Sequence, residues 1–383
     1  MNFSFAAPHK ILIESGGLNG LHKHIGPYGK RFLFVTATAL EKAGLAERVQ
    51  KQIELSGGTC FTFSGVDTEP TVEQVEEARA FAIANKCDAV ISLGGGSAMD
   101  TGKAAAALAT NPGSILDYLE GVGKELPITV TPLPFIAIPT TSGTGSEATK
   151  NAVIMSSKLG FKKSIRSDNM LARIALIDAE LTLGLPPMQT AASGMDALCQ
   201  VIESYVTAKR NPVTDALAIK GIEHAGRTLK TAVLDGGNLA AREGMALASL
   251  LGGICLANAG LALAHGMAPA LGVVKNLPHG LACGIALDHT MKVNLPAVTE
   301  RYARVGEALT GRRFHSDEAA AQAAVETVTQ LKADTGIPAD LKGYHITPAE
   351  LDALVEGSMA SGTKVNPVPM TKESMRELYI SMM

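Results

Sequence analysis

Residues 88–109 read DAVISLGGGSAMDTGKAAAALA, and they change from a strand pattern to a helix pattern across a run of glycines. The segment Asp88 to Leu93 is short and apolar, which predicts a buried strand, and the alanine-rich segment Thr101 to Ala109 predicts a helix. Glycines allow a backbone to approach a phosphate group closely, and a helix N-terminus offers it free N–H groups. The turn between the two segments is therefore a candidate phosphate-binding loop, although an ordinary strand-to-helix turn would have the same spacing.

Similar strand and helix segments alternate on both sides of this turn. Apolar runs predict strands at 31–36, 60–63, 88–93 and 135–139, and helical periodicity predicts helices at 40–55 and 72–85. Strands separated by helix-length segments pair in parallel through right-handed crossovers. The first half of the chain is therefore predicted to be an α/β domain of the nucleotide-binding kind, assigned to residues 1–185.

The pattern changes after a Pro-Pro pair at 186–187, where β-branched runs disappear and alanine-rich helical periodicity takes over. It predicts helices at 187–208, 211–234, 239–260, 297–310 and 316–335, with shorter ones after residue 348. The most apolar stretch, Met245 to Ala264, is interrupted by polar residues and glycines, so it is predicted to be a buried helix or helix pair rather than a membrane span. Residues 186–383 are therefore assigned to an all-α domain.

The composition limits the classes of function that this chain can have. Its 383 residues are 46% hydrophobic and 19% charged, which allows substantial cores and argues against disorder. The net charge is −3 and no block of like charge occurs, so neither nucleic acid nor a membrane is an expected partner. The five cysteines have no CxxC spacing and the N-terminal sequence has no secretory-signal pattern, so the expected location is the cytoplasm.

A second loop with binding chemistry is PTTSGTGSE at 139–147, which again follows a predicted strand. Its hydroxyl side chains and two glycines can surround a ribose or a phosphate with donors, although a Ser/Thr-rich surface loop would have the same composition. No GxGxxG follows the first predicted strand, and residues 35–38, VTAT, lack the acid that usually holds an NAD ribose. The choice between NAD and NADP therefore stays open.

Two histidines and two oxygen-bearing residues form a candidate metal site in the second half. Asp196 and Gln200 are four residues apart on a predicted helix and so share one face, where both can offer oxygen ligands. His265 and His279 would complete an N₂O set with Asp196, which is a catalytic type of site for Fe²⁺ or Zn²⁺. An isolated histidine is more often a satisfied core or surface residue, and Asp196 alone could be an exposed acid or a cap, so the interpretation depends on all three together.

Together these motifs resemble the iron-containing alcohol dehydrogenase family along essentially the whole chain. The matching motifs are GGGSAMD at 94–100, PTTSGTGSE at 139–147, IALIDAELTLGLPP at 174–187, GMDAL at 194–198, AHGMA at 264–268, LPHG at 277–280 and Asn-Pro at 366–367. The resemblance implies an α/β dinucleotide-binding domain followed by an all-α domain, a dehydroquinate synthase-like fold. It also implies a homodimer or higher homo-oligomer that acts on a small alcohol or aldehyde.

The resemblance further assigns residues to the cofactor and to the metal. It places the pyrophosphate of NAD or NADP at the glycine loop, with additional contacts from the Thr-rich loop and one lysine. The cofactor-binding residues implied in this way are Gly95, Gly96, Ser97, Ala98, Met99, Asp100, Thr140, Thr141, Thr144 and Lys162. Asp196, His265 and His279 match three of the family's four metal ligands, and Gln200 stands at the position of the fourth.

Four positions depart from the family pattern. Gln200 replaces a histidine ligand, and its neutral amide is expected to lower the metal affinity. Pro269 replaces a histidine that helps to move a proton, so no proton-relay histidine can be identified and the catalytic residues stay unassigned. Glu69 and Ala37 stand where the family often has an asparagine and an aspartate.

The favoured function is an NAD(P)-dependent, metal-dependent alcohol dehydrogenase or aldehyde reductase for small primary alcohols and aldehydes, with Fe²⁺ favoured over Zn²⁺. The ion would polarise the substrate oxygen while hydride moves to or from the nicotinamide. Two alternatives stay open: a metal-independent reductase resembling maleylacetate reductase, and a catalytically silent cofactor-binding subunit. Basic residues at 158–166 could favour an anionic aldehyde, although a solvated basic hairpin is the simpler interpretation.

Overall fold

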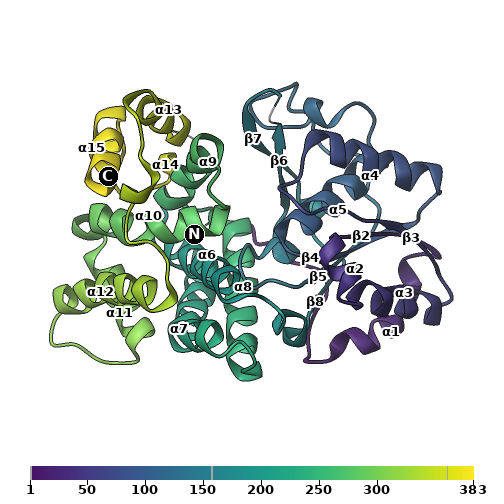
Figure 1. Ribbon diagram of the computed structural model, residues 1–383, viewed down its shortest axis with the longest axis horizontal. Coiled ribbons are helices and arrows are strands. Elements are labelled where there is room, and N and C mark those ends of the chain that lie inside the picture. Colours follow the sequence, from purple (N-terminus) through teal and green to yellow (C-terminus); the bar gives the residue numbers. More distant parts are fainter. Residues whose placement is uncertain (1, 157, 360) are drawn as a thin grey trace. The chain divides into compact units, whose positions relative to one another are not determined.

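The computed structural model of the chain describes residues 2–156, 158–359 and 361–383, and its elements are labelled in Figure 1. The chain divides into two compact units. The α/β unit consists of Ala6–Thr141 and Ser146–Thr182, and the helical unit is built mainly from Leu183–Met383 together with the short loop Ser142–Gly145. The chain passes from one unit to the other between residues 182 and 183, whereas the sequence analysis placed a boundary at 185/186.

The α/β unit is built on a six-stranded sheet with the order β1-β8-β5-β4-β2-β3, in which every neighbouring pair is parallel. Its strands are β1 (Ile11–Ile13), β2 (Arg31–Thr36), β3 (Thr59–Phe63), β4 (Ala89–Gly94), β5 (Phe135–Pro139) and β8 (Ile174–Ile177). The four predicted strands are confirmed as β2, β3, β4 and β5, and so is their parallel pairing. The sequence analysis did not assign β1 and β8 as strands, because three or four residues are too few for periodicity to identify.

Helices cover both faces of this sheet, and the alternation of side chains along β2 shows how. Phe32 and Phe34 are buried in one apolar cluster with α1 (His22–Ile25) and α3 (Leu45–Leu55). The intervening Leu33 and Val35 are buried in a second cluster, on the other face, with α4 (Val72–Ala84) and α5 (Gly96–Leu108). A parallel strand that is buried on both faces has no polar side, which explains why β2 reads as a continuous apolar run.

One predicted helix, 40–55, is wrong as a continuous element. The structure has α2 (Thr38–Lys42) and α3, separated by Gly44, whose φ of 73° lies in the left-handed region. A left-handed residue cannot continue a right-handed helix, so the chain restarts after it. The shorter 3-10 turns of this unit are Gly17–Gly20, Gly26–Tyr28, Ile115–Asp117, Ser146–Ala148, Asp168–Met170 and Ala179–Thr182.

The basic residues at 158–166 lie on a two-stranded antiparallel hairpin of β6 (Asn151–Ser156) and β7 (Phe161–Arg166). Two of these cations are paired with acids of the same unit, Lys162 with Glu69 at 2.9 Å and Arg166 with Glu120 at 3.0 Å. The segment therefore forms a hairpin, as predicted, and the preference for an anionic aldehyde stays a prediction.

The helical unit confirms the predicted change to an all-α pattern. Its helices are α6 (Pro187–Val206), α7 (Pro212–Leu234), α8 (Leu239–Ala259), α9 (Leu263–Lys275), α10 (His279–Asn294), α11 (Thr299–Thr310), α12 (Asp317–Thr335), α13 (Pro348–Ser358), α14 (Ser361–Lys364) and α15 (Lys372–Met382), with 3-10 turns at Leu295–Ala297 and Lys342–Tyr344. Among the described residues, α8 alone is long and apolar enough to cross a membrane, but 72% of its most apolar window is buried inside the protein. Its composition is that of a core helix.

Candidate metal centre and cofactor loops

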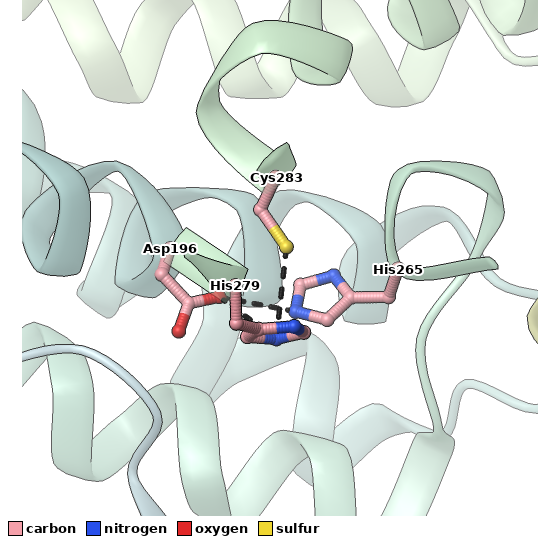
Figure 2. A group of neighbouring side chains, drawn as sticks. All are labelled: Asp196, His265, His279 and Cys283. Atoms are coloured by element: carbon pink, nitrogen blue, oxygen red, sulfur yellow. Dashed lines mark hydrogen bonds and ion pairs between the residues drawn. The ribbon is translucent and has the colours of Figure 1, made fainter. Parts of the chain in front are cut away.

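Three elements of the helical unit bring Asp196, His265 and His279 together (Figure 2). Asp196 lies in the middle of α6, His265 in the first turn of α9, and His279 is the first residue of α10. The Oδ1 atom of Asp196 lies 3.2 Å from Nε2 of His265 and 3.8 Å from Nε2 of His279. The two imidazole rings meet edge to face with centroids 5.3 Å apart. The three predicted ligands therefore converge on one small volume.

A glycine allows α10 to begin directly beside α6. A Cβ atom on Gly280 would lie 2.5 Å from the carbonyl oxygen of Ala192 and 3.3 Å from the Cβ of Asp196. Any larger residue would push the start of α10 away, because real Cβ atoms do not approach a carbonyl oxygen this closely. The glycine of the LPHG motif thus brings the neighbouring His279 within reach of Asp196.

A second carboxylate, which the sequence analysis did not identify, orients His265. Glu203 of α6 accepts a hydrogen bond from Nδ1 of His265 at 2.8 Å, and it accepts backbone N–H bonds from Ala262 at 3.1 Å and Ala264 at 2.6 Å. It thereby satisfies N–H groups at the start of α9, which have no partner within the helix. With Nδ1 donating to Glu203, Nε2 is the ring nitrogen that faces Asp196, and it would bind an ion after giving up any proton that it carries.

Two buried cysteines also belong to this site, and the sequence analysis did not identify them either. Sγ of Cys283 lies 3.7 Å from Nε2 of His279, and Sγ of Cys199 lies 3.6 Å from Nδ1 of His265. Cys283 is four residues after His279 on α10, so the two share a helix face, and Cys199 is three residues after Asp196 on α6. One donor atom from each of Asp196, His265, His279 and Cys283 lies within 4.8 Å of the other three.

The charges of these groups show that the centre suits a cation. Burial alone would lower the pKa of His265, but Cys283, Asp196 and Glu203 favour the protonated ring and raise that pKa well above its ordinary value. Burial alone would raise the pKa of the Cys283 thiol, but its contact with Cys199 and the nearby imidazoles lower it well below the usual range. The protonated ring of His265 thus places a positive charge between these acidic groups. A bound divalent ion would supply that positive charge in place of the proton.

Gln200, the predicted fourth ligand, is held by the loop Ser142–Gly145. Its Nε2 donates to the carbonyl oxygen of Gly143 at 3.1 Å, which fixes the amide so that Oε1 lies on the opposite side. Oε1 is buried and has no hydrogen-bond partner among the described residues. It lies 3.4 Å from the position that a Cβ on Gly252 of α8 would occupy.

The glycine loop forms the first turn of α5, which begins at Gly96 rather than at the predicted Thr101. Gly95 is the residue before the helix, and its carbonyl oxygen accepts the N–H of Met99 at 3.1 Å. The N–H groups of Gly96, Ser97 and Ala98 therefore precede the first intrahelical bond and are available to a ligand.

Further predicted cofactor residues of the α/β unit are hydrogen-bonded to neighbouring segments or packed against them. The N–H of Thr140 donates to the carbonyl oxygen of Gly94 at 2.8 Å, which joins the ends of β4 and β5, and Thr141 packs beside Gly95. Asp100 accepts hydrogen bonds from Ser146 Oγ at 2.5 Å and from the N–H of Val153 at 2.8 Å, so its carboxylate holds the two segments that follow the Thr-rich loop.

Two predicted cofactor residues and one departure lie elsewhere. Thr144 belongs to the loop Ser142–Gly145, which is part of the helical unit. Lys162 lies on the β6–β7 hairpin in its ion pair with Glu69. Pro269 lies inside α9, one turn after His265, and offers neither a ring nitrogen that titrates nor an N–H group.

The sequence and the fold were compared with known proteins. Residues 8–179 match the family described as iron-containing alcohol dehydrogenase, and residues 190–383 match the C-terminal part of the Fe-containing alcohol dehydrogenase family. Alcohol dehydrogenase 4 of Schizosaccharomyces pombe (strain 972 / ATCC 24843) is 36% identical over 384 residues, which cover 99% of this chain and 89% of that protein.

Solved structures give the same result for the fold. A crystal structure of 1,3-propanediol oxidoreductase superposes with a TM-score of 0.95 at 31% identity and covers 100% of both chains. Sulfoacetaldehyde reductase from Bifidobacterium kashiwanohense, solved in complex with NAD⁺, superposes with a TM-score of 0.90 at 30% identity, covering 100% of this chain and 99% of that one. Since both halves match in sequence and the whole chain matches in structure, this protein belongs to the iron-containing alcohol dehydrogenase family.

Proposed function

We propose that this protein is an NAD(P)-dependent alcohol dehydrogenase or aldehyde reductase that interconverts small primary alcohols and aldehydes and requires a divalent metal ion. The observation that carries the proposal is the convergence of Asp196, His265 and His279 in the helical unit. Relatives over the full length of the chain are named as alcohol dehydrogenases, and one relative structure contains NAD⁺. Fe²⁺ is the favoured ion by family membership, and Zn²⁺ suits the same ligands.

In this proposal residues 186–383 form the metal- and substrate-binding domain. Asp196, His265 and His279 hold the ion, Glu203 orients His265, and Gln200 Oε1 is the candidate for a neutral fourth ligand. A bound divalent ion supplies Lewis acidity to a carbonyl or alcohol oxygen. The protein's part is to hold the three donors at fixed positions in a buried setting, so that no reorganisation is needed when the substrate arrives.

Residues 1–185 form the dinucleotide-binding domain in this proposal. The free N–H groups of Gly96, Ser97 and Ala98 at the start of α5 suit the pyrophosphate of NAD or NADP. The remaining residues proposed for the cofactor are Gly95, Met99, Asp100, Thr140, Thr141, Thr144 and Lys162. The nicotinamide supplies or accepts the hydride.

The proposed proton path does not use a histidine on α9. Pro269 lies inside α9 at the position where the family often has that residue, so the hydroxyl groups of the Thr-rich loop and solvent are the proposed carriers. Restoring the side chain with Pro269→His tests this point. An unchanged rate supports the hydroxyl path, whereas a sharply raised rate would show that a histidine relay has been lost.

Metal content and turnover test the proposal together. The full-length protein, purified anaerobically without chelator, is expected to contain close to one Fe or Zn per chain by elemental mass spectrometry and to oxidise NADH or NADPH with small aldehydes. Asp196→Ala should lose both the metal and the turnover, whereas Asp352→Ala, which removes an exposed carboxylate on α13, should retain both. Turnover by metal-free wild-type protein would instead favour a metal-independent reductase, and bound NADH without turnover would favour a silent subunit.

We also propose a homodimer or higher homo-oligomer, by family membership, and a cytoplasmic location, from the cysteine pattern and the N-terminal sequence. Light scattering of the purified protein tests the oligomeric state, and a monomer at micromolar concentration would contradict it.

A further inference from the structure

Cys283 is the one donor at the metal centre that the family resemblance does not explain. Its thiol comes from the second turn of α10 and points at the group formed by Asp196, His265 and His279 (Figure 2). The side chain is fully buried, and its nearest partners are the imidazoles and the thiol of Cys199. A buried cysteine in a purely apolar setting would be inert packing, but this one faces a carboxylate and two histidines.

The distances between these donors are close to those that a shared ion requires. With metal–nitrogen and metal–oxygen bonds of about 2.0–2.1 Å and metal–sulfur bonds of about 2.3 Å, tetrahedral ligands lie roughly 3.3–3.6 Å from one another. Here Asp196 Oδ1 lies 3.2 Å from His265 Nε2 and 3.8 Å from His279 Nε2, and Cys283 Sγ lies 3.7 Å from His279 Nε2. These three distances are within a few tenths of an ångström of the tetrahedral values, and every other pair among the four donors lies within 4.8 Å.

The charge of the donors favours the thiolate over the amide of Gln200. Asp196 and a Cys283 thiolate would place two negative charges in direct contact with a divalent cation, whereas the amide of Gln200 is neutral. The nitrogen of the Gln200 amide binds Gly143, and its buried oxygen has no hydrogen-bond partner among the described residues, so the Gln200→Ala variant below tests that oxygen.

Family membership alone points to Gln200 as the fourth ligand and to Fe²⁺; from the side chains present we propose instead that Sγ of Cys283 is the fourth protein ligand of the ion at this centre, and that the resulting Asp-His-His-Cys set selects Zn²⁺ over Fe²⁺. Thiolate is a softer ligand than the imidazole or amide that it replaces, and soft ligands favour Zn²⁺. This inference rests on the proposed function only in requiring that an ion binds to Asp196, His265 and His279.

X-ray absorption of the zinc-loaded wild-type chain tests the ligand without any substitution. One sulfur scatterer at about 2.3 Å is expected beside nitrogen and oxygen scatterers at about 2.0–2.1 Å. Nitrogen and oxygen scatterers alone would overturn the inference and leave the metal-dependent function standing. If the chain binds no zinc at all, the inference and the metal-dependent part of the proposed function fall together.

Cobalt loading of variants identifies which sulfur is bound. The Co²⁺ form of the wild type should show a thiolate-to-cobalt charge-transfer band in the near ultraviolet, which Cys283→Ser should abolish and which the matched buried variant Cys199→Ser should keep. Loss of the band in Cys199→Ser alone would overturn the assignment to Cys283. Gln200→Ala should also keep the band, and its loss there would overturn the exclusion of Gln200 from the ligand set.

Competition with chelators measures the metal preference. Cys283→Ser is expected to weaken Zn²⁺ binding by about tenfold or more, the lower end of what disturbing a metal site costs, and to weaken Fe²⁺ binding less. Equal losses for the two ions would overturn the claim that the thiolate sets the preference. Circular dichroism of each apoprotein verifies that the variants are folded.

Discussion

Glu203 accepts a hydrogen bond from Nδ1 of His265 at 2.8 Å while its two oxygens also bind N–H groups at the start of α9. A carboxylate behind a ligand histidine fixes the ring and raises its basicity, and losing one typically costs 10–100-fold (roughly) in metal affinity. We therefore expect Glu203→Gln to weaken zinc binding by about 10–100-fold with little loss of fold, because the amide oxygen can still accept from the backbone. A chelator competition measures the affinity.

The matched control is Glu223→Gln on α7, which removes a partly exposed carboxylate paired with Lys220 in the same unit. Its zinc affinity should equal that of the wild type. If Glu203→Gln also binds zinc normally, the carboxylate serves only to cap α9 and does not tune the metal centre.

Much of the fold follows from periodicity, and the errors have local causes. Strands β2 to β5 could be predicted because each is a buried run of five or six residues between turn signals. The break between α2 and α3 could not, because the apolar spacing continues across it and only the left-handed φ of Gly44 interrupts the helix. β1 and β8 pair with each other in register over three residues, and such short segments acquire their strand conformation from the sheet.

The candidate site likewise contains residues that the sequence predicts and residues that it does not. Asp196, His265 and His279 could be identified because residue type and motif context single them out. Glu203 and Cys283 could have been found from helical spacing, since they follow Asp196 by seven residues and His279 by four. CxxC spacing, by which cysteine metal sites are recognised in a sequence, does not occur in a ligand set that is assembled from three helices. The hydrogen bond from the side-chain amide of Gln200 to the carbonyl oxygen of Gly143 joins residues 57 positions apart, and no local sequence signal predicts it.

Burial makes the stability of the α/β unit depend on pH through Glu147. The side chain is buried, and burial raises its pKa from 4.5 to about 7, against the opposing effect of Lys103. Between these two pKa values the folded protein holds a proton that the unfolded chain releases. Below pH 4.5 this residue leaves the free energy of unfolding unchanged, and as the pH rises from 4.5 to about 7 it lowers that free energy progressively. The full cost is on the order of 3 kcal/mol.

Glu147→Gln should remove that cost. We expect the variant to exceed the wild type in the free energy of unfolding by up to about 3 kcal/mol at pH 8, with the difference vanishing near pH 4. Denaturant melts at several pH values measure this, and Glu318→Gln on the surface of α12 is a control with the same charge change. A variant that is less stable than the wild type at pH 8 would show that the carboxylate is ionised and held by Lys103.

Close contact between two glycines fixes the loop Ser142–Gly145 against α8. A Cβ atom on Gly253 would lie 2.1 Å from the carbonyl oxygen of Gly145, whose φ of 60° keeps that residue in the left-handed region. We expect Gly253→Ala to destabilise the helical unit by about 1–3 kcal/mol through overpacking. Gly272→Ala on α9 meets only one atom, at 3.5 Å, and should be neutral or slightly stabilising. Thermal unfolding compares the two, and equal stability would mean that the loop moves without cost.

Lys332 and Asp288 form a buried ion pair between α12 and α10. Nζ of Lys332 donates to Asp288 Oδ1 at 2.5 Å and to the carbonyl oxygens of Ile285 and Ala339 at 2.8 and 2.9 Å. Lys332→Met would leave the buried Asp288 carboxylate with the ammonium group of Lys292 at 3.6 Å, the imidazole of His289 at 3.9 Å and the hydroxyl of Thr329, which donates at 2.9 Å. The expected loss in the free energy of unfolding is about 3–5 kcal/mol, because an uncompensated buried charge is far more costly than an apolar pair.

The double variant Asp288→Asn/Lys332→Met separates the charge from the packing. With no charge left to bury, it should recover most of the stability that Lys332→Met loses, and chemical denaturation at pH 7 measures all three proteins. Recovery would show that the ion pair has little net effect on the free energy of unfolding. The cost of burying its two charges would then be offset by the three hydrogen bonds that the lysine donates. A double variant as unstable as Lys332→Met would instead assign the loss to the hydrogen bonds that the lysine donates, above all to the two carbonyl oxygens, because no buried charge remains in the double variant to account for it.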